Sequence, residues 1–375
     1  MDMKGILDNR ELEEAPPDKL VGSAGSALVE SRLLTRAGTS AVYQRRWREA
    51  RFDPDKFKNL EDLRRAPFTT ERDLASACRG KDIRSYACSP VHMWFRVTGR
   101  GGATWWMPCG RQDILKMMGL CGRMSRVVGL ADDDLALVLS QPAPAASDSL
   151  PYFLGYAHRL KQGERLEVMP VSLSLLQHRP KWAAFFLQRK PTVLVTTPAD
   201  ALQLAGILKG NTAAPTRTDS SVAHQPPAGP TSTGRAVNTE PRGPLERLRL
   251  ALLFGDGVGQ HRQRVTEEYG VDTFQIEGAT DCLLLNVECR THQGVHIWLD
   301  TCIAEILPAT DSDARSAESQ AVFLHEAKPG TRGELVVTTF GEALPLIRYR
   351  TGETVEMVSN ERCPCGLSHP RVRFL

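Results

Sequence analysis

The sequence has no apolar run approaching the roughly 20 residues that a membrane-spanning helix requires. The best candidate is the short stretch from Leu248 to Phe254. The chain also carries little net charge, because 47 basic residues stand against 44 acidic ones and leave +3. Proteins that bind nucleic acid or anionic membranes through a global field need a larger basic excess. We therefore expect neither nucleic acid nor a membrane among the partners.

A secretory signal peptide is also missing, since the chain starts with the acidic string Met1-Asp-Met-Lys4. The nine cysteines are an odd number and are scattered along the sequence, which is not the pattern of a disulfide framework. Both observations favour a protein of the reducing cytoplasm.

What is present is ordinary for a globular protein: 41% hydrophobic and 24% charged residues. At 375 residues the chain exceeds one typical domain of roughly 100 to 200 residues, so one large α/β domain or two lobes are expected. Strand-like runs at 134–139, 167–171 and 192–198 are interleaved with helical patterns, of which 111–128 is the clearest. This alternation predicts a parallel, doubly wound sheet.

Two segments are predicted to be poorly ordered. Residues 1–34 are polar and rich in small side chains. Residues 211–243 consist almost entirely of Pro, Thr, Ser, Gly and Ala, and cannot bury enough apolar surface to offset an ordering entropy of about 1 to 2 kcal/mol per residue. We read the second segment as a disordered insertion in an α/β core over 35–288, which a β-rich part over 289–375 follows.

The clearest β-α-β unit lies directly after that insertion. It consists of a strand at 248–254, a tight turn at Gly255-Asp256-Gly257, a helix at 260–269 closed by Gly270, and a strand at 271–276. Ligands of such sheets bind beyond the carboxyl ends of the strands. The turn and the segment Glu277-Gly-Ala-Thr-Asp281 should therefore lie at the same mouth of the sheet.

A glycine-rich loop, Thr98-Gly-Arg-Gly-Gly-Ala-Thr104, follows an apolar run. Its glycines can expose backbone N–H groups to a phosphate, and the two threonines add hydroxyl donors. By itself this pattern is more often a flexible turn.

Cys289 and His296 precede the pair Cys363 and Cys365. Three thiols and an imidazole can close a tetrahedral zinc site, which would be structural because four protein ligands leave no open position. His369 is the alternative histidine ligand. The competing interpretation is ordinary buried thiols and a surface histidine.

The most specific strings lie in the last third: Gly333-Glu-Leu-Val-Val-Thr-Thr339, Ala343-Leu-Pro-Leu-Ile-Arg-Tyr-Arg-Thr-Gly-Glu353 and Cys363-Pro-Cys-Gly366. They resemble the ribose-binding segment and the zinc-carrying end of phenylacetate-CoA ligases, a branch of the adenylate-forming superfamily. Val42-Tyr-Gln-Arg-Arg-Trp47 and Ala66-Pro-Phe-Thr-Thr-Glu-Arg-Asp-Leu74 resemble the helical opening of the same family. The resemblance covers roughly residues 35–375 and implies an adenylate-forming N-terminal core with a smaller zinc-bearing part.

The resemblance also implies a chemistry. ATP activates a carboxylic acid as acyl-AMP, which is then transferred to coenzyme A or another acceptor, and Mg²⁺ and a structural Zn²⁺ are the expected metals. Thr280, Asp281 and Arg350 take the catalytic positions, as phosphate-binding hydroxyl, magnesium ligand and cation beside the phosphates. The implied nucleotide-binding residues are Thr98, Gly99, Arg100, Gly101, Gly102, Gly255, Asp256, Gly257, Glu277, Gly278 and Glu353. The implied metal ligands are Cys289, His296, Cys363 and Cys365.

The sequence departs from the family pattern at four places. The loop lacks the paired threonines and the lysine, Glu277 replaces an aromatic stacking residue, and Glu353 replaces an aspartate that binds ribose. The sequence also stops soon after Cys365, where the family continues into a mobile C-terminal lobe.

Two hypotheses follow. The first is an adenylating enzyme that works with a C-terminal lobe on another chain or with an unusual acyl acceptor. The second is a non-catalytic descendant that binds a partner or a small acid. Trp105, Trp106 and Phe153 suggest an aromatic-lined pocket and hence an aryl acid, and the resemblance suggests a homodimer.

Overall fold

The computed structural model describes residues 10–80, 83–99, 101–140, 154, 166–178, 185–186, 188–211, 245–255, 257–278, 282–308 and 320–375. Its helices are α2 (Arg10–Glu13), α3 (Pro17–Glu30), α4 (Leu33–Ala37), α5 (Ala41–Glu49), α6 (Glu71–Cys78), α7 (Arg111–Val128), α9 (Leu173–His178), α11 (Pro198–Asn211) and α12 (Val258–Tyr269), with short 3-10 helices at Pro54–Lys56, Leu60–Arg65 and Ile83–Tyr86. Its strands are β1 (Met93–Thr98), β2 (Thr104–Cys109), β3 (Leu135–Ser140), β4 (Glu167–Ser172), β5 (Val193–Thr196), β6 (Leu250–Leu253), β7 (Asp272–Glu277), β8 (Asn286–Glu288), β9 (Val295–His296), β10 (Cys302–Leu307), β11 (Val322–Phe323), β12 (Arg332–Thr339), β13 (Tyr349–Ser359) and β14 (Arg371–Phe374).

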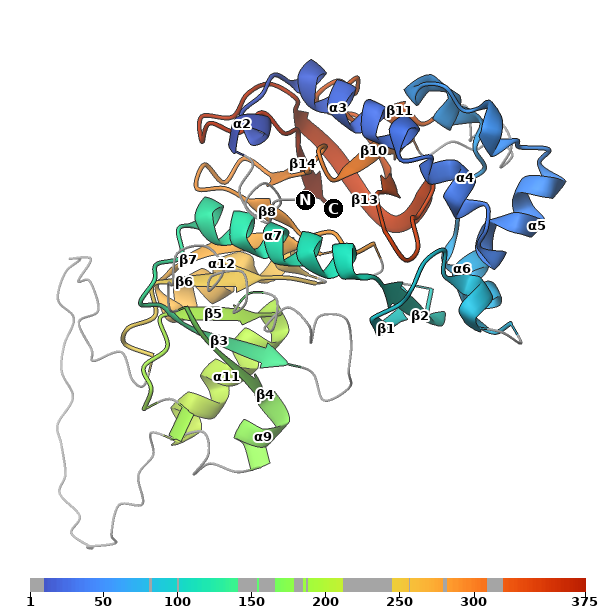
Figure 1. Cartoon of the computed structure of the whole chain (residues 1–375). Helices are drawn as coiled ribbons and strands as arrows, with labels where there is room; N and C mark the ends of the chain where they lie inside the picture. Colours follow the sequence, from blue (N-terminus) through green and yellow to red (C-terminus); the bar gives the residue numbers. More distant parts are fainter. Residues whose placement is uncertain are drawn as a thin grey trace, which may run out of the picture.

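The strands other than β1 and β2 form one mixed sheet in the order β11-β10-β12-β13-β14-β9-β8-β7-β6-β5-β3-β4. Strands β4, β3, β5, β6 and β7 run parallel to one another, as the alternation of helices and strands predicts. From β7 onward every pairing is antiparallel. Figure 1 shows the two halves, with the parallel strands below α7 and the antiparallel strands above it. The predicted boundary between the α/β core and the β-rich part, at 288/289, therefore falls inside one continuous sheet.

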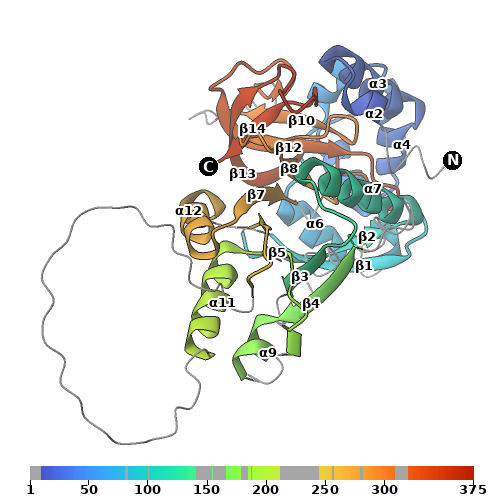
Figure 2. The ribbon, with the colours of Figure 1, turned by 90° about the vertical axis from the view of Figure 1, so that its left-hand side faces the viewer.

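Successive residues of the parallel strands enter different cores. Val193 and Val195 of β5 belong to the core that also contains Met117 and Met118 of α7. Leu194 between them belongs to a second core, with residues of α11 and α12. This is the alternation of a strand buried on both faces, and it makes three layers, with α7 on one face and α11 and α12 on the other. Figure 2 shows α7 and α12 on opposite sides of β7.

The described part of the N-terminus is ordered, so the prediction of poor order is wrong for residues 10–34. Helix α3 buries Leu20, Ala24 and Leu28, which are spaced four apart and lie on one helix face. Glu13 of α2 is also buried, and its carboxylate pairs with Arg123 of α7 at 2.9 Å. The small and polar residues of this segment suggest poor order, but the helix is stabilised by the surface against which it packs, and local composition does not reveal that surface.

Several other predicted elements are confirmed. Helix α7 has the predicted bounds, and α6 starts with a capping box between Thr70 and Asp73. Helix α12 ends at Gly270 in the left-handed conformation. Thr351 and Gly352, which as a Thr-Gly pair suggest a turn, instead lie in a bulge within β13, where the register to β12 shifts and Gly352 has φ of +73°. Residues 212–244, most of the predicted insertion, lie outside the described residues.

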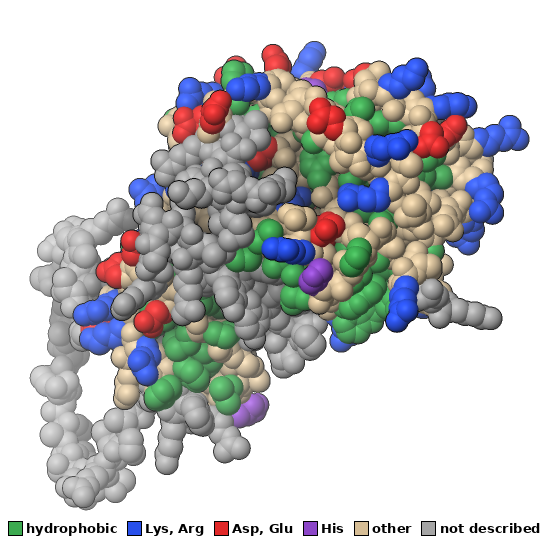
Figure 3. Space-filling model, viewed as in Figure 1, with side chains coloured by type: hydrophobic (Ala, Val, Ile, Leu, Met, Phe, Trp, Pro, Cys, Tyr) green, Lys and Arg blue, Asp and Glu red, His purple; other side chains and the backbone are tan. Residues whose placement is uncertain are grey.

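None of the helices in the described ranges is long and apolar enough to cross a membrane. Figure 3 shows side chains of both charges interspersed over one face, in keeping with the small net charge.

A buried ion pair lies where the N-terminal segment meets the antiparallel strands. The Arg348 guanidinium donates from Nε to Glu305 Oε2 at 3.0 Å and from Nη2 to Glu305 Oε1 at 2.8 Å. The two side chains are 0% and 1% exposed. Nη1 donates to the carbonyls of Arg64 and Ala66 at 2.9 and 3.0 Å, and the guanidinium carbon lies 4.2 Å from the centre of the Phe68 ring. One side chain thus connects the N-terminal segment, β10 and the approach to β13.

Replacing Arg348 by Met should lower the free energy of unfolding by about 3 to 5 kcal/mol, because it leaves the Glu305 carboxylate buried and uncompensated. Arg350→Met is the matched control: this arginine lies two residues away and is 44% exposed, so its loss should cost less than about 1 kcal/mol. Urea unfolding followed by circular dichroism measures both values. If Arg348→Met does not fold, the double variant Arg348→Met/Glu305→Leu should recover a folded protein. Equal effects of the two single variants would contradict this account.

Candidate functional site

The carboxyl ends of β5, β6 and β7 lie at one edge of the sheet. Thr196 pairs with Leu253, and Leu253 pairs with Gln275, so the residues after these strands leave the sheet together. A β-carbon at Gly255 would lie only 3.7 Å from Thr197 Cγ2. The structure therefore brings the turn after β6 and the end of β7 to the predicted mouth of the sheet. Asp256, Thr280 and Asp281 lie outside the described residues.

Helix α12 starts at this edge. Its N-cap residue, Gly257, has φ of +78°, a left-handed conformation that favours glycine. His261 donates its backbone N–H to the Gly257 carbonyl at 2.9 Å, which begins the helical hydrogen-bond pattern. The N-terminus of a helix carries partial positive charge and unpaired N–H groups, so this end of α12 favours an anion.

Glu277 and Gly278 close β7 at the same edge. The Gln275 side-chain amide donates to Glu277 Oε1 at 2.6 Å, which orients the carboxylate. A β-carbon at Gly278 would lie 3.4 Å from the Leu284 carbonyl, so the returning chain passes close by. A carboxylate held in this way offers a hydrogen-bond acceptor and no surface on which adenine can stack.

The predicted phosphate loop is the tip of the β1–β2 hairpin. Gly99 donates its N–H to the Ala103 carbonyl at 2.8 Å, and Gly102 donates to Gly99 at 2.9 Å. The Gly101 N–H donates to Glu71 Oε2 of α6 at 3.1 Å. One N–H that would serve a phosphate is therefore bonded to a carboxylate of the same chain. Arg100 lies outside the described residues.

At the base of this tip, Thr98 and Thr104 lie opposite each other on the two strands. Their hydroxyl oxygens are 3.4 Å apart. Both side chains are exposed, so these hydroxyls can also serve as donors to a bound phosphate.

Arg350 lies on β13, and its guanidinium binds Glu334 of β12. Nε and Nη2 donate to Glu334 Oε2 at 2.8 and 2.5 Å, and the Gly352 N–H donates to the other carboxylate oxygen at 3.0 Å. Sequence analysis missed this pair because the two residues are adjacent only once β12 and β13 are in register. Glu353 follows in the bulge, half-buried, with its N–H donated to Thr351 Oγ1 at 3.1 Å.

Backbone hydrogen bonds connect this strand to the loop. Thr69 donates its N–H to the Arg348 carbonyl at 3.0 Å and accepts the Arg350 N–H at 2.9 Å. Glu71, two residues further on, reaches the loop glycines. The glycine loop and Arg350 are therefore neighbours through a short segment. No sequence signal pointed to Glu71, since it looks like an ordinary first-turn acidic residue.

The two tryptophans do not line a common pocket. Trp105 is 1% exposed and Trp106 is 45% exposed, because adjacent residues of β2 point to opposite faces. Phe153 lies outside the described residues. The predicted aromatic pocket is not formed by these two side chains.

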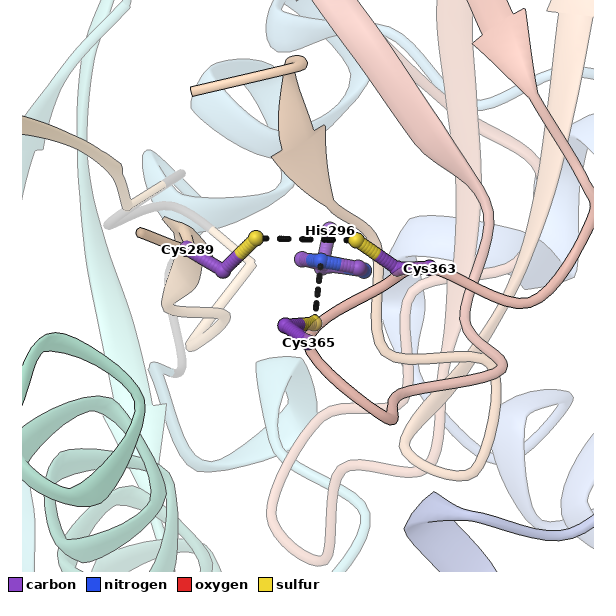
Figure 4. Close-up of side chains that lie close together, drawn as sticks. All are labelled: Cys289, His296, Cys363 and Cys365. Carbon is purple, nitrogen blue, oxygen red and sulfur yellow. Dashed lines mark hydrogen bonds between the residues drawn. The ribbon is translucent and has the colours of Figure 1, made fainter. Parts of the chain in front are cut away.

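Cys289, His296, Cys363 and Cys365 form a compact cluster, as Figure 4 shows. Their sulfur and nitrogen atoms all lie within 4.8 Å of one another. The Sγ atoms of Cys289 and Cys363 are 3.7 Å apart, and Cys365 Sγ is 3.5 Å from His296 Nε2. Ligands 2.0 to 2.3 Å from a tetrahedral ion are roughly 3.4 to 3.8 Å from one another, so these separations fit one ion.

The orientation of His296 also fits a metal ligand. Its Nδ1 lies 3.0 Å from the His369 carbonyl oxygen, which accepts a hydrogen bond and leaves the Nε2 lone pair facing the thiols. His369 itself is outside the cluster: its Nδ1 accepts the Leu299 N–H at 3.2 Å. Burial lowers the pKa of His369 to about 3, so it is a neutral structural side chain. The structure thus groups His296, and not His369, with the three thiols.

The cluster favours ionisation of Cys289 and Cys363, whose pKa values are lowered, while the hydrogen bond to Cys289 raises the pKa of Cys365. A hydrogen bond from Cys365 holds the pKa of the Cys289 thiol far below its ordinary value. Burial alone would lower the pKa of His296, but hydrogen bonds to Cys289 and Cys363 raise it to about 9. Thiolates are the form that binds a metal, and protonation competes with binding.

Comparison with known proteins finds the same similarity to phenylacetate-CoA ligases that the sequence motifs indicate. No protein-family model matches the chain. A phenylacetate-coenzyme A ligase of Thermus thermophilus is 26% identical over an alignment of 388 positions, covering 96% of this chain and 71% of that protein. The Escherichia coli phenylacetate-coenzyme A ligase is 24% identical, covering 84% of this chain and 62% of that protein. The chain is similar to these two phenylacetate-coenzyme A ligases.

The solved structures agree on the fold. A 2-hydroxyisobutyryl-CoA ligase in complex with its acyl-AMP and CoA superimposes with a TM-score of 0.69 at 19% identity, covering 96% of this chain and 68% of that one. An open conformation of the same ligase gives a TM-score of 0.68. The prediction of an α/β fold is confirmed, and its mixed sheet matches the fold of this CoA ligase. About a third of the solved 2-hydroxyisobutyryl-CoA ligase chain and more than a third of the Escherichia coli ligase lie outside the part that this chain covers.

Proposed function

We propose that this phenylacetate-CoA ligase relative activates a carboxylic acid with ATP and transfers the acyl group to the thiol of coenzyme A. The observation that carries the proposal is that the similarity to a phenylacetate-coenzyme A ligase extends over 96% of the chain. The edge itself offers an anion-favouring helix end and two tight glycine turns, as a nucleotide site requires.

The proposed reaction has two steps. The substrate carboxylate attacks the α-phosphorus of ATP, the bond to the β-phosphate oxygen breaks, and pyrophosphate leaves with acyl-AMP remaining. The thiolate of coenzyme A then attacks the acyl carbonyl carbon, and AMP leaves. Negative charge grows on the phosphate oxygens in the first step. Hydrogen-bond donors that are already oriented toward these oxygens therefore lower the barrier, by roughly 3 kcal/mol for each donor.

Each proposed residue has a defined part in this chemistry. The Gly101 N–H and the Thr98 hydroxyl donate to phosphate oxygens, and Gly99 and Gly102 let the loop backbone approach them, while Gly255 and Gly257 let the chain turn beside the adenine. Thr280 donates to the α-phosphate, and Asp281 would hold Mg²⁺, which neutralises phosphate charge when bound. Arg350 supplies positive charge once it exchanges Glu334 for phosphate, and Glu353 accepts from the ribose hydroxyls.

The purified chain should bind magnesium-ATP with a micromolar dissociation constant by calorimetry, and should catalyse acid-dependent exchange of pyrophosphate into ATP. Asp281→Asn should weaken binding on the order of 10- to 100-fold, because it removes a magnesium ligand. Asp272→Asn is the matched control, since Asp272 starts the strand β7 at its opposite end and pairs with His292 at 3.2 Å. It should leave binding unchanged.

A flat titration from a folded protein would contradict the ligase proposal. It would favour the alternative of a non-catalytic relative that binds a partner or a small acid. Exchange measured with phenylacetate, benzoate and acetate then tests the finer proposal that the acid is an aryl acid. Weak exchange that a separately added C-terminal lobe stimulates would support the proposal that catalysis uses a lobe or acceptor from another chain.

We further propose that the Cys289, His296, Cys363 and Cys365 cluster holds a structural zinc ion. The donor set suits zinc, and all four positions of a tetrahedral ion are taken by the protein. The ion would tie the turn after β8 and strand β9 to the loop before β14. It would therefore stabilise the antiparallel half of the sheet and take no part in the reaction.

The purified chain should contain about one zinc per molecule by elemental analysis. Cys363→Ser should lose the metal and lower the midpoint of thermal unfolding, because the ion is bound by the folded state. Cys78→Ser, at a half-buried thiol outside the cluster, should keep both the metal and the midpoint of thermal unfolding. Zinc should also dissociate as the pH falls from 7 to 5, since protons compete for the thiolates. Full zinc content in Cys363→Ser would contradict the proposed ligand set.

None of the nine cysteines forms a disulfide, and the cytoplasmic location expected from the sequence stays a prediction. The homodimer implied by the resemblance stays a prediction.

A further inference from the structure

The carboxylate of Glu71 lies in the glycine loop. Its Oε2 accepts the Gly101 N–H at 3.1 Å. A β-carbon at Gly99 would overlap the same carboxylate, and one at Gly101 would lie 3.0 Å from Oε2. The two glycines are thus the positions that allow an acidic side chain to approach the backbone of the loop. This contact is between segments that are 30 residues apart in the sequence.

The backbone on which Glu71 stands is held on both sides. Before it, Thr69 exchanges backbone hydrogen bonds with Arg348 and Arg350. At the helix start, Thr70 and Asp73 form a reciprocal capping box, with bonds of 2.8 and 3.3 Å. Glu71 is therefore a defined part of the loop's surroundings, and only its own side-chain torsions need to change for the carboxylate to leave.

A carboxylate and a phosphate oxygen seek the same partner. Both are anionic acceptors, and a backbone N–H binds either of them with a charge-assisted hydrogen bond. Two anions cannot share one such site without strong repulsion. Among the described residues, no basic side chain is bonded to the Glu71 carboxylate, which accepts the Gly101 N–H.

We propose that Glu71 determines the affinity of the glycine loop by occupying the position of a nucleotide phosphate. This inference rests on the proposed function. A nucleotide phosphate enters the loop only as the carboxylate leaves, so each ligand must overcome this competition. ATP does so because its adenine and ribose gain contacts at the carboxyl ends of β6 and β7 and at Glu353 of β13. Free pyrophosphate bears the same cost without these contacts, and it therefore binds weakly.

The consequence for the reaction is a weaker hold on the product. Pyrophosphate that is formed in the first step loses its covalent link to the nucleotide, and with it the contacts that kept Glu71 displaced. The returning carboxylate then competes with pyrophosphate for Gly101. Glu71 thereby favours product release.

The test is calorimetry of the full chain with magnesium-ATP and, separately, with magnesium pyrophosphate. Glu71→Gln keeps the shape and can still accept the Gly101 hydrogen bond, but it removes the charge. We expect it to bind pyrophosphate at least about tenfold more tightly than the parent chain, and ATP also more tightly, because like-charge repulsion is lost. Glu71→Ala should do the same. Glu11→Gln is the matched control, an acidic residue in the first turn of α2 whose side chain is 91% exposed.

The outcomes separate this inference from the proposed function. If the parent chain binds ATP and Glu71→Gln binds both ligands with unchanged affinity, the role of Glu71 is wrong and the nucleotide site stands. Weaker binding by Glu71→Gln would also overturn the inference, since the carboxylate would then assist the nucleotide. If neither protein binds ATP or pyrophosphate while both stay folded, the proposed function fails as well. Tighter binding by Glu11→Gln would show an effect of net charge alone and overturn the inference.

Discussion

The buried pair of Arg348 and Glu305 is the interaction on which the arrangement of the remaining structure depends. Two charges taken out of water are stable only when every hydrogen-bonding group finds a partner. Arg348 achieves this by reaching across β10 and the segment at 64–68 at the same time. The N-terminal helices, the antiparallel strands and the approach to β13 are thereby held in one register. The same register places Thr69 against β13, and with it the helix α6 that reaches the glycine loop.

The candidate nucleotide site is formed by two parts of the structure that are held in place differently: an edge of the buried sheet and the tip of an exposed hairpin. The edge at Gly255 and Glu277 follows parallel strands that are buried on both faces, and its position follows from the sheet. The glycine loop lies on a separate two-stranded hairpin whose tip is exposed. It is connected to the sheet through Thr69 and Glu71. A ligand that bridges the edge and the loop would therefore join a fixed surface to one that depends on side-chain contacts.

Two acidic residues of this chain already hold groups that the phosphates would need. Glu334 binds the Arg350 guanidinium, and Glu71 binds the Gly101 N–H. In the absence of nucleotide both contacts satisfy donors that would otherwise depend on water. A nucleotide must replace them with stronger ones, so its affinity is a difference between two sets of charge-assisted bonds. The cluster of Cys289, His296, Cys363 and Cys365 is different in kind, since its sulfur and nitrogen atoms converge on one point.

The sequence by itself determined the order of elements, the parallel half of the sheet, the bounds of α7 and the identity of the four residues in the metal cluster. These follow from local periodicity, capping and ligand chemistry, which neighbouring residues encode. The tertiary structure alone decided that residues 10–34 are helical and packed, that Arg348 is buried, and that Glu71 and Glu334 reach the loop and Arg350. Each of these depends on contacts between residues far apart in the chain, which no local pattern carries. Burial and charge pairing are properties of the surface that a segment meets, and that surface exists only after folding.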